Sequence, residues 1–101
     1  MKKTEQELDD FLSEFIDSDE NSELVGFLIS TKISAAAVKL FDWRNKIIYK
    51  IARQDNLVLM YDPDEEEFGI AYLTAGEITN SELIGSLSYA LQEMKKRSMQ
   101  S

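Results

Sequence analysis

The 101-residue sequence contains neither cysteine nor histidine. Without cysteine there is no disulfide bond and no thiol nucleophile, and without both residues the usual ligands of zinc and copper are missing. Histidine is also the commonest general base near neutral pH. We therefore expect a protein that is not an enzyme, with no catalytic residues, no cofactor and no metal site.

Glycine and proline are also scarce, with four residues and one, which predicts few and short loops. No apolar run approaches the ~18 residues that suggest a membrane span. Met1, Lys2 and Lys3 are followed by acidic residues, where an export signal would continue with an apolar segment. We expect a single domain over 1–101, frayed at 1–3 and 98–101, that is cytoplasmic and does not contact a membrane.

Acidic residues outnumber basic ones by 19 to 11, and the net charge of −8 is arranged in blocks. Residues 4–23 and 55–94 contain acidic residues and no basic ones. Between them, residues 24–54 contain six basic residues and one acid, and a basic run at 95–97 follows the second acidic block. This layout indicates either pairing of opposite blocks or an acidic surface that faces a partner.

Two helices are expected in the first half of the chain. Thr4 and Glu7 have the spacing of a capping box, and apolar residues follow at helical intervals to an end near Asp17. From Ser22 to Arg53, one apolar stripe with a spacing of three or four predicts a single long helix. The stripe consists of Val25, Ile29, Ile33, Ala36, Leu40, Trp43, Ile47 and Ile51. In the alternative, Leu24–Ser30 is a buried strand and the helix is broken after it, because short apolar runs fit either structure.

A β-hairpin is expected after the long helix. Branched and aromatic residues bounded by turn formers mark strands at 57–61 and 68–74. The connection from Asp62 to Glu67 is longer than a tight hairpin turn. Because two strands alone are marginally stable, we expect helices to cover one face or a partner to extend the sheet.

A further helix is predicted near the C-terminus. Thr79 and Glu82 have the spacing of a second capping box, and Leu83 begins an apolar helical face that extends to Met94. Basic residues at 95–97 suit the negative end of a helix dipole. The predicted fold is therefore a small α+β domain: a helix, a long helix that is continuous or broken, a β-hairpin and a C-terminal helix.

The connection of the predicted hairpin concentrates five carboxylates in six positions. The candidate partner-binding residues are these five and two acids of the first helix: Asp62, Asp64, Glu65, Glu66, Glu67, Asp10 and Glu14. Calcium also takes carboxylate ligands, but a calcium loop needs glycine where Glu67 stands and glutamate where Leu73 stands. The simplest alternative is a solvated tip whose charges discourage association of sheet edges.

The missing catalytic residue types and the acidic blocks predict a non-enzymatic protein-binding module that occupies a basic surface on a protein partner. Inhibitors, immunity proteins, antitoxins and chaperones act in this way. One alternative is a self-associating structural or assembly protein, such as a homodimer held by opposite charge blocks. A third is a carboxylate-dependent cation-binding protein or enzyme. The basic segment lacks the aromatic interleaving of nucleic-acid-binding modules, which argues against direct nucleic-acid binding.

Overall fold

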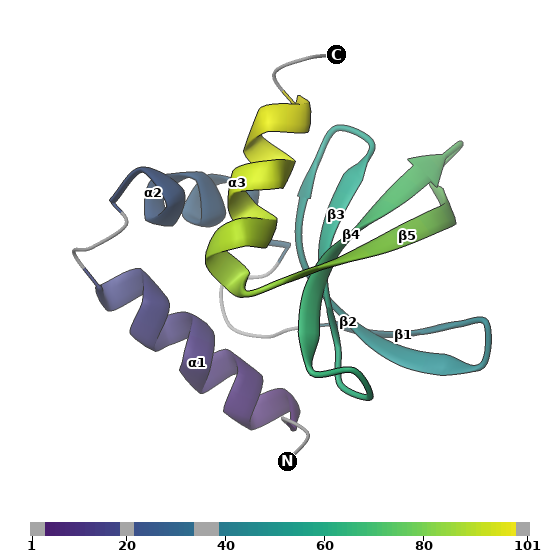
Figure 1. The fold of residues 1–101 in the computed structure, drawn as a ribbon, viewed down its shortest axis with the longest axis horizontal. Coiled ribbons are helices and arrows are strands. Elements are labelled where there is room, and N and C mark those ends of the chain that lie inside the picture. The colour runs from purple at the N-terminus through teal and green to yellow at the C-terminus, as the bar shows by residue number, and fades with distance from the viewer. Residues whose placement is uncertain (1–3, 19–21, 34–38, 99–101) are drawn as a thin grey trace.

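The computed structural model describes residues 4–18, 22–33 and 39–98. In these residues the chain forms two helices, five strands and a final helix (Figure 1), so the predicted α+β class is confirmed. The elements are α1 (Glu5–Asp17), α2 (Ser22–Thr31), β1 (Lys39–Trp43), β2 (Lys46–Gln54), β3 (Leu57–Asp62), β4 (Glu67–Thr74), β5 (Glu77–Gly85) and α3 (Leu87–Ser98). The expected fraying at 1–3 and 99–101 lies outside the described residues, whereas Ser98 is the last residue of α3.

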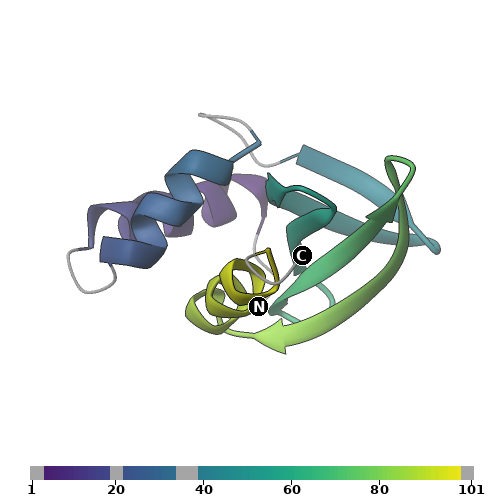
Figure 2. The same cartoon turned by 90° about the horizontal axis from the view of Figure 1, so that it is seen from above.

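The five strands form one antiparallel sheet in the order β1-β2-β3-β4-β5. Each strand pairs with its neighbour in the chain, so every connection within the sheet is a hairpin. The sheet curls into a half-barrel, and the three helices lie on its outer side (Figure 2). Across the described residues, none of the helices is long and apolar enough to span a membrane.

The curled sheet buries apolar side chains on both faces. On the helix side, residues of all three helices pack against β2, β3 and β4, and the largest buried side chains there include Leu8, Leu28, Leu59, Tyr61, Ile70 and Leu91. A smaller cluster fills the inside of the curve: Ile48, Val58, Met60, Ala71 and Leu73, with Phe41, Trp43 and Ile78 packed against it. β3 contributes to both clusters, which explains why its apolar residues, 57–61, are all buried.

The helix predicted over Ser22–Arg53 is wrong beyond Thr31, where α2 ends. The strand alternative for Leu24–Ser30 is also wrong, because these residues lie within α2. Three members of the predicted buried stripe are among the most exposed apolar residues described: Ile29, Leu40 and Ile47 are 57%, 52% and 59% exposed. Ala36, another member, lies outside the described residues.

The second half of that segment is instead the hairpin β1–β2. Its two-residue turn, Arg44 and Asn45, has positive φ at both positions (54° and 64°), which is the pattern of a type I′ turn. Neither residue is glycine, so the usual sequence signal of this turn is missing. Apolar residues spaced three or four apart also occur on strands. This spacing therefore did not distinguish a strand from a helix in residues 39–54.

The predicted C-terminal helix begins later than expected. Thr79 and Glu82 lie in β5, not at a helix start. The strand ends at Gly85, whose φ is +129°, and the Ser86 hydroxyl then accepts a hydrogen bond from the Tyr89 backbone N–H at 3.3 Å. Ser86 therefore caps α3. The first helix, the hairpin now seen as β3–β4, and the basic last turn of α3 are confirmed.

Candidate functional site

The β3–β4 turn is organised around Asp62, the last residue of β3. Its Oδ1 accepts hydrogen bonds from the backbone N–H groups of Asp64, at 2.9 Å, and Glu65, at 3.3 Å. Pro63 is buried beside it, and Glu66 has a positive φ of 55°. The Asp62 side chain thus holds the turn in one shape, as aspartate does in many turns.

The other carboxylate oxygen of Asp62 pairs with Lys46, the first residue of β2. Lys46 Nζ lies 2.9 Å from Asp62 Oδ2. Burial raises the pKa of the Asp62 carboxyl, but hydrogen bonds from Lys46 and the two backbone N–H groups outweigh it, so this pKa lies below its usual value. The hydrogen bond to Asp62 in turn raises the pKa of the Lys46 ammonium above its usual value, despite its desolvation. Both groups are charged at neutral pH.

Asp62 is therefore placed differently from the other candidate residues of the turn. It is only 3% exposed and both of its oxygens have protein partners. Asp64, Glu65 and Glu66 are exposed, and Glu67 is half-buried opposite Asp62 in the strand ladder. Asp62 shapes the turn from inside, and the residues after it supply the surface charge.

The two candidate acids of α1 lie on its exposed side. Asp10 and Glu14 are exposed, and Asp10 accepts a hydrogen bond from Gln6 at 3.0 Å. The Thr4 hydroxyl caps the helix at the predicted position: it accepts a hydrogen bond from the Glu7 backbone N–H at 3.2 Å and donates one to the Glu7 carboxylate. This cap fixes where the acidic helix starts.

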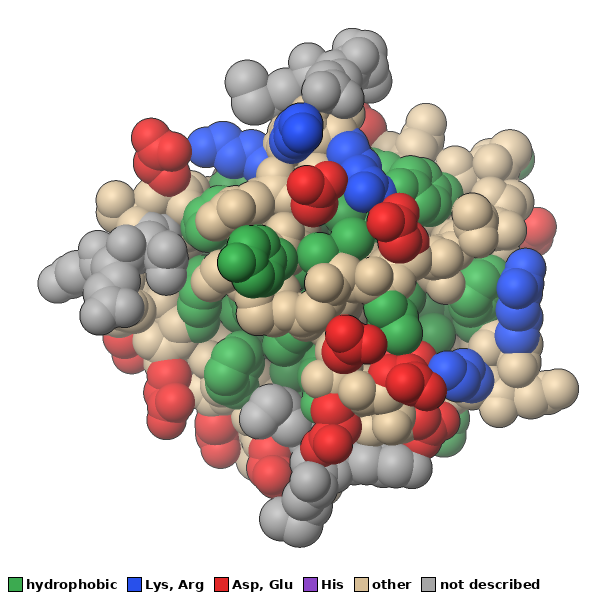
Figure 3. Space-filling view, in the orientation of Figure 1, with side chains coloured by type: hydrophobic (Ala, Val, Ile, Leu, Met, Phe, Trp, Pro, Cys, Tyr) green, Lys and Arg blue, Asp and Glu red, His purple; other side chains and the backbone are tan. Residues whose placement is uncertain are grey.

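Packing brings α1 next to the β3–β4 turn. The Phe11 ring of α1 stacks on Phe68, at the start of β4, with ring centroids 5.8 Å apart. Figure 3 shows acidic side chains gathered along the lower side of the molecule, over α1 and this turn. We call the exposed carboxylates of these two elements the acidic surface; its members include Asp10, Glu14, Asp64, Glu65 and Glu66. The structure thus brings together residues that lie about fifty positions apart in the chain.

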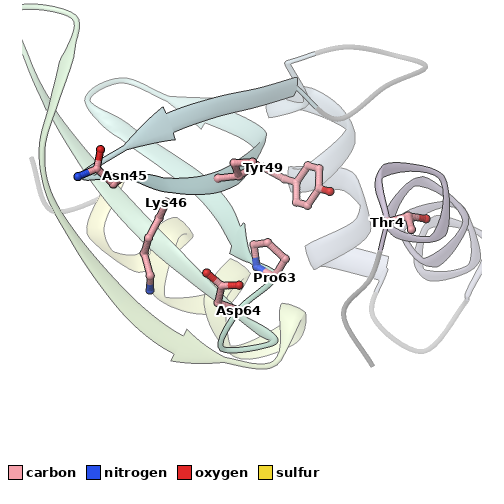
Figure 4. Close-up of a pocket in the computed structure, with 7 residues that line it drawn as sticks. Thr4, Asn45, Lys46, Tyr49, Pro63 and Asp64 are labelled. Carbon is pink, nitrogen blue, oxygen red and sulfur yellow. The ribbon is translucent and has the colours of Figure 1, made fainter.

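A pocket lies at one end of the acidic surface (Figure 4). Its volume is about 440 Å³, and its lining residues come from the start of α1, from the β1–β2 hairpin and from the β3–β4 turn: Thr4, Asn45, Lys46, Ile47, Tyr49, Pro63 and Asp64. Sequence reasoning identified Asp64 alone among these as a candidate. The other lining residues belong to segments whose approach depends on sheet pairing, and no local motif marks them.

Most of the basic segment, which was predicted to lie on the long helix, forms the hairpin β1–β2, where two cations lie over aromatic rings. Aromatic residues therefore do alternate with basic ones here, contrary to the interpretation of the sequence. The guanidinium carbon of Arg44 is 4.4 Å from the Trp43 ring centroid, and Lys50 Nζ is 4.7 Å from that of Phe41. Such contacts stabilise the pair by about 0.5–1 kcal/mol at exposed sites. These two side chains therefore also help to cover the inner apolar cluster.

A second polar cluster joins α3 to the sheet. Arg97 binds Glu82 of β5 at 3.0 Å and Glu93 of its own helix at 3.2 Å, and it donates to the Tyr72 hydroxyl. The hydrogen bond to Glu82 raises the pKa of the Arg97 guanidinium above its usual value. A pocket of about 260 Å³ lies beside it, bounded also by the β2–β3 turn. Because Arg97 already has two carboxylate partners, the cluster is best explained as a structural link.

The part of the chain that the structure describes contains no group of three or more carboxylates placed to hold a metal ion.

Comparison of the chain with protein-family models, with curated proteins and with solved structures finds no match. The functional interpretation therefore depends on the geometry of the acidic surface and its pocket.

Proposed function

We propose that this protein is a binding module that acts by covering a basic surface on a partner protein. The observation that carries the proposal is the acidic surface itself. Acids from two distant segments, α1 and the β3–β4 turn, lie side by side on one side of the molecule. Like charges repel, so their gathering needs a reason beyond the stability of the fold.

The shape of the β3–β4 turn supports the same proposal. The turn is held by Asp62 and anchored to β2 through Lys46, so its exposed carboxylates are presented in a fixed arrangement. A preorganised surface loses less conformational entropy when a partner binds. Charge complementarity also accelerates association and selects against partners of the wrong charge.

The experiment compares two double variants that remove the same number of charges. Glu65→Gln with Glu66→Gln removes two charges from the acidic surface. Asp55→Asn with Glu77→Gln removes two exposed charges at the opposite end of β3 and β4, where Asp55 lies in the β2–β3 turn and Glu77 begins β5. Partners of the tagged wild-type chain are captured from cells that encode it, identified by mass spectrometry, and measured again with each variant.

We expect the surface variant to bind its partner at least about tenfold more weakly, and the control variant to bind like the wild type. We also expect the affinity to fall as salt is raised, because salt screens exposed charges. Equal affinities for the two variants would refute the proposal. If the chain alone sediments as a dimer that the surface variant dissociates, the partner is a second copy.

A further inference from the structure

The pocket beside the acidic surface has apolar walls as well as polar ones. Tyr49 is a buried lining residue, and its ring centroid is 6.3 Å from that of Tyr61. Ile47 lies on the same face of β2 and is largely exposed, and the buried Pro63 of the β3–β4 turn also lines the pocket. Covering this exposed isoleucine and the neighbouring ring with another apolar group would lower the free energy, because apolar surface would be removed from water.

The charge around the pocket favours a cationic occupant. Lys46 is the basic residue of the lining, and the buried Asp62 neutralises it at 2.9 Å. Asp64 and Glu65 of the turn also act on Lys46, raising the pKa of its ammonium, so their negative charge reaches this space. Figure 4 shows Asp64 and Lys46 on the same side of the pocket, away from Thr4. The local balance is therefore negative.

We propose that the pocket receives an arginine side chain of the basic partner, with its guanidinium beside Asp64 and its aliphatic stem against Ile47 and Pro63. This inference depends on the function proposed above and names the group that the acidic surface recognises. Arginine fits better than lysine because its guanidinium is planar, weakly hydrated and stacks on aromatic rings, whereas an ammonium keeps its water. A volume of about 440 Å³ lies within the range of ligand pockets.

The test uses hexa-arginine and hexa-lysine peptides, which carry equal charge, titrated into the full chain and followed by NMR. We expect hexa-arginine to bind several-fold more tightly and to shift the backbone amides of Asn45–Tyr49 and Asp64. Ile47→Ser should weaken hexa-arginine binding by about fivefold, because it removes an apolar contact and no charge. It should leave hexa-lysine binding unchanged, because the hydrated ammonium of lysine keeps that side chain out of the pocket.

Leu40→Ser is the matched control, because Leu40 is an exposed apolar residue of β1 that does not line the pocket. It should leave the binding of both peptides unchanged. If Ile47→Ser also changes nothing while Glu65→Gln with Glu66→Gln weakens both peptides equally, the pocket proposal is wrong and the acidic binding module stands. If neither peptide binds at low salt, both proposals fail.

Discussion

At the scale of single residues, Asp62 has the most consequences for the candidate site. It is an acid among acids in the sequence, yet its carboxylate points inward and orders the turn through two backbone N–H groups. Removing it would leave these donors without their acceptor and Lys46 without its partner. The charge of the turn and its shape thus depend on different residues.

The ion pair of Asp62 makes a prediction about pH. The pKa of this carboxyl is lowered by folding, so its contribution to stability is present above the unfolded pKa of about 3.9 and is lost as the pH falls through the folded pKa. We expect Asp62→Asn to lower the free energy of unfolding at pH 7 by about 1 kcal/mol. The difference from the wild type should shrink as the pH is lowered below about 4.

Urea unfolding of both proteins between pH 7 and pH 2.5, followed by the fluorescence of Trp43, measures this difference. Asp64→Asn is the control, since it removes a neighbouring acid and keeps the contacts of Asp62. A constant difference between wild type and Asp62→Asn across the whole pH range would contradict the prediction.

At the scale of elements, the close approach of β4 and β5 depends on a glycine. A Cβ atom built on Gly69 would collide with the backbone carbonyl oxygen of Glu82 in the neighbouring strand. The register of this strand pair also shifts between Phe68 and Gly69, as at a β-bulge. A larger residue at position 69 would push the two strands apart.

We therefore expect Gly69→Ala to lower the free energy of unfolding by about 2 kcal/mol, since backbone cannot yield as a flexible side chain does. Gly26→Ala is the matched control of opposite sign. Gly26 is exposed in α2 with no atom near its added Cβ, so alanine should stabilise the protein by about 0.5–1 kcal/mol. Urea unfolding of both variants tests the pair, and equal effects would show that glycine content, not strand contact, decides the outcome.

Turn geometry at this scale explains where sequence patterns misled. The turns at Arg44–Asn45 and Ala75–Gly76 both have positive φ at two successive residues, but Gly76 is the one glycine among these four residues. Where the glycine is present, the end of β4 is evident from the sequence. Where the glycine is missing, at Arg44–Asn45, the sequence of the hairpin β1–β2 has the apolar spacing of a continuing helix.

At the scale of the whole molecule, Arg97 joins α3 to strands β4 and β5 of the sheet. The guanidinium contacts Glu82 of β5 and Tyr72 of β4, and β5 is the last strand in the order of the sheet. These contacts hold the end of α3 against the sheet.

We expect Arg97→Ala to lower the free energy of unfolding by about 1 kcal/mol, because the pairs are partly exposed. A double-mutant cycle with Glu82→Gln should show a coupling of a few tenths of a kcal/mol or more, whereas a cycle with exposed Glu77→Gln should show none. Additive effects of Arg97→Ala and Glu82→Gln would mean that the contact does not stabilise the fold.

The sequence by itself determined the features that depend on neighbours in the chain. The capping box at Thr4 and the helical spacing after it define α1, and turn formers on both sides define β3 and β4. The missing histidine and cysteine and the charge blocks also need no structure to be seen.

Only the tertiary structure decided which distant segments meet. Residues 39–54 form backbone hydrogen bonds with each other and with β3, and this pairing overrides their helical spacing. The same pairing places Lys46 against Asp62 and opens the pocket beside α1. These contacts join residues far apart in the sequence, and local spacing carries no information about such contacts.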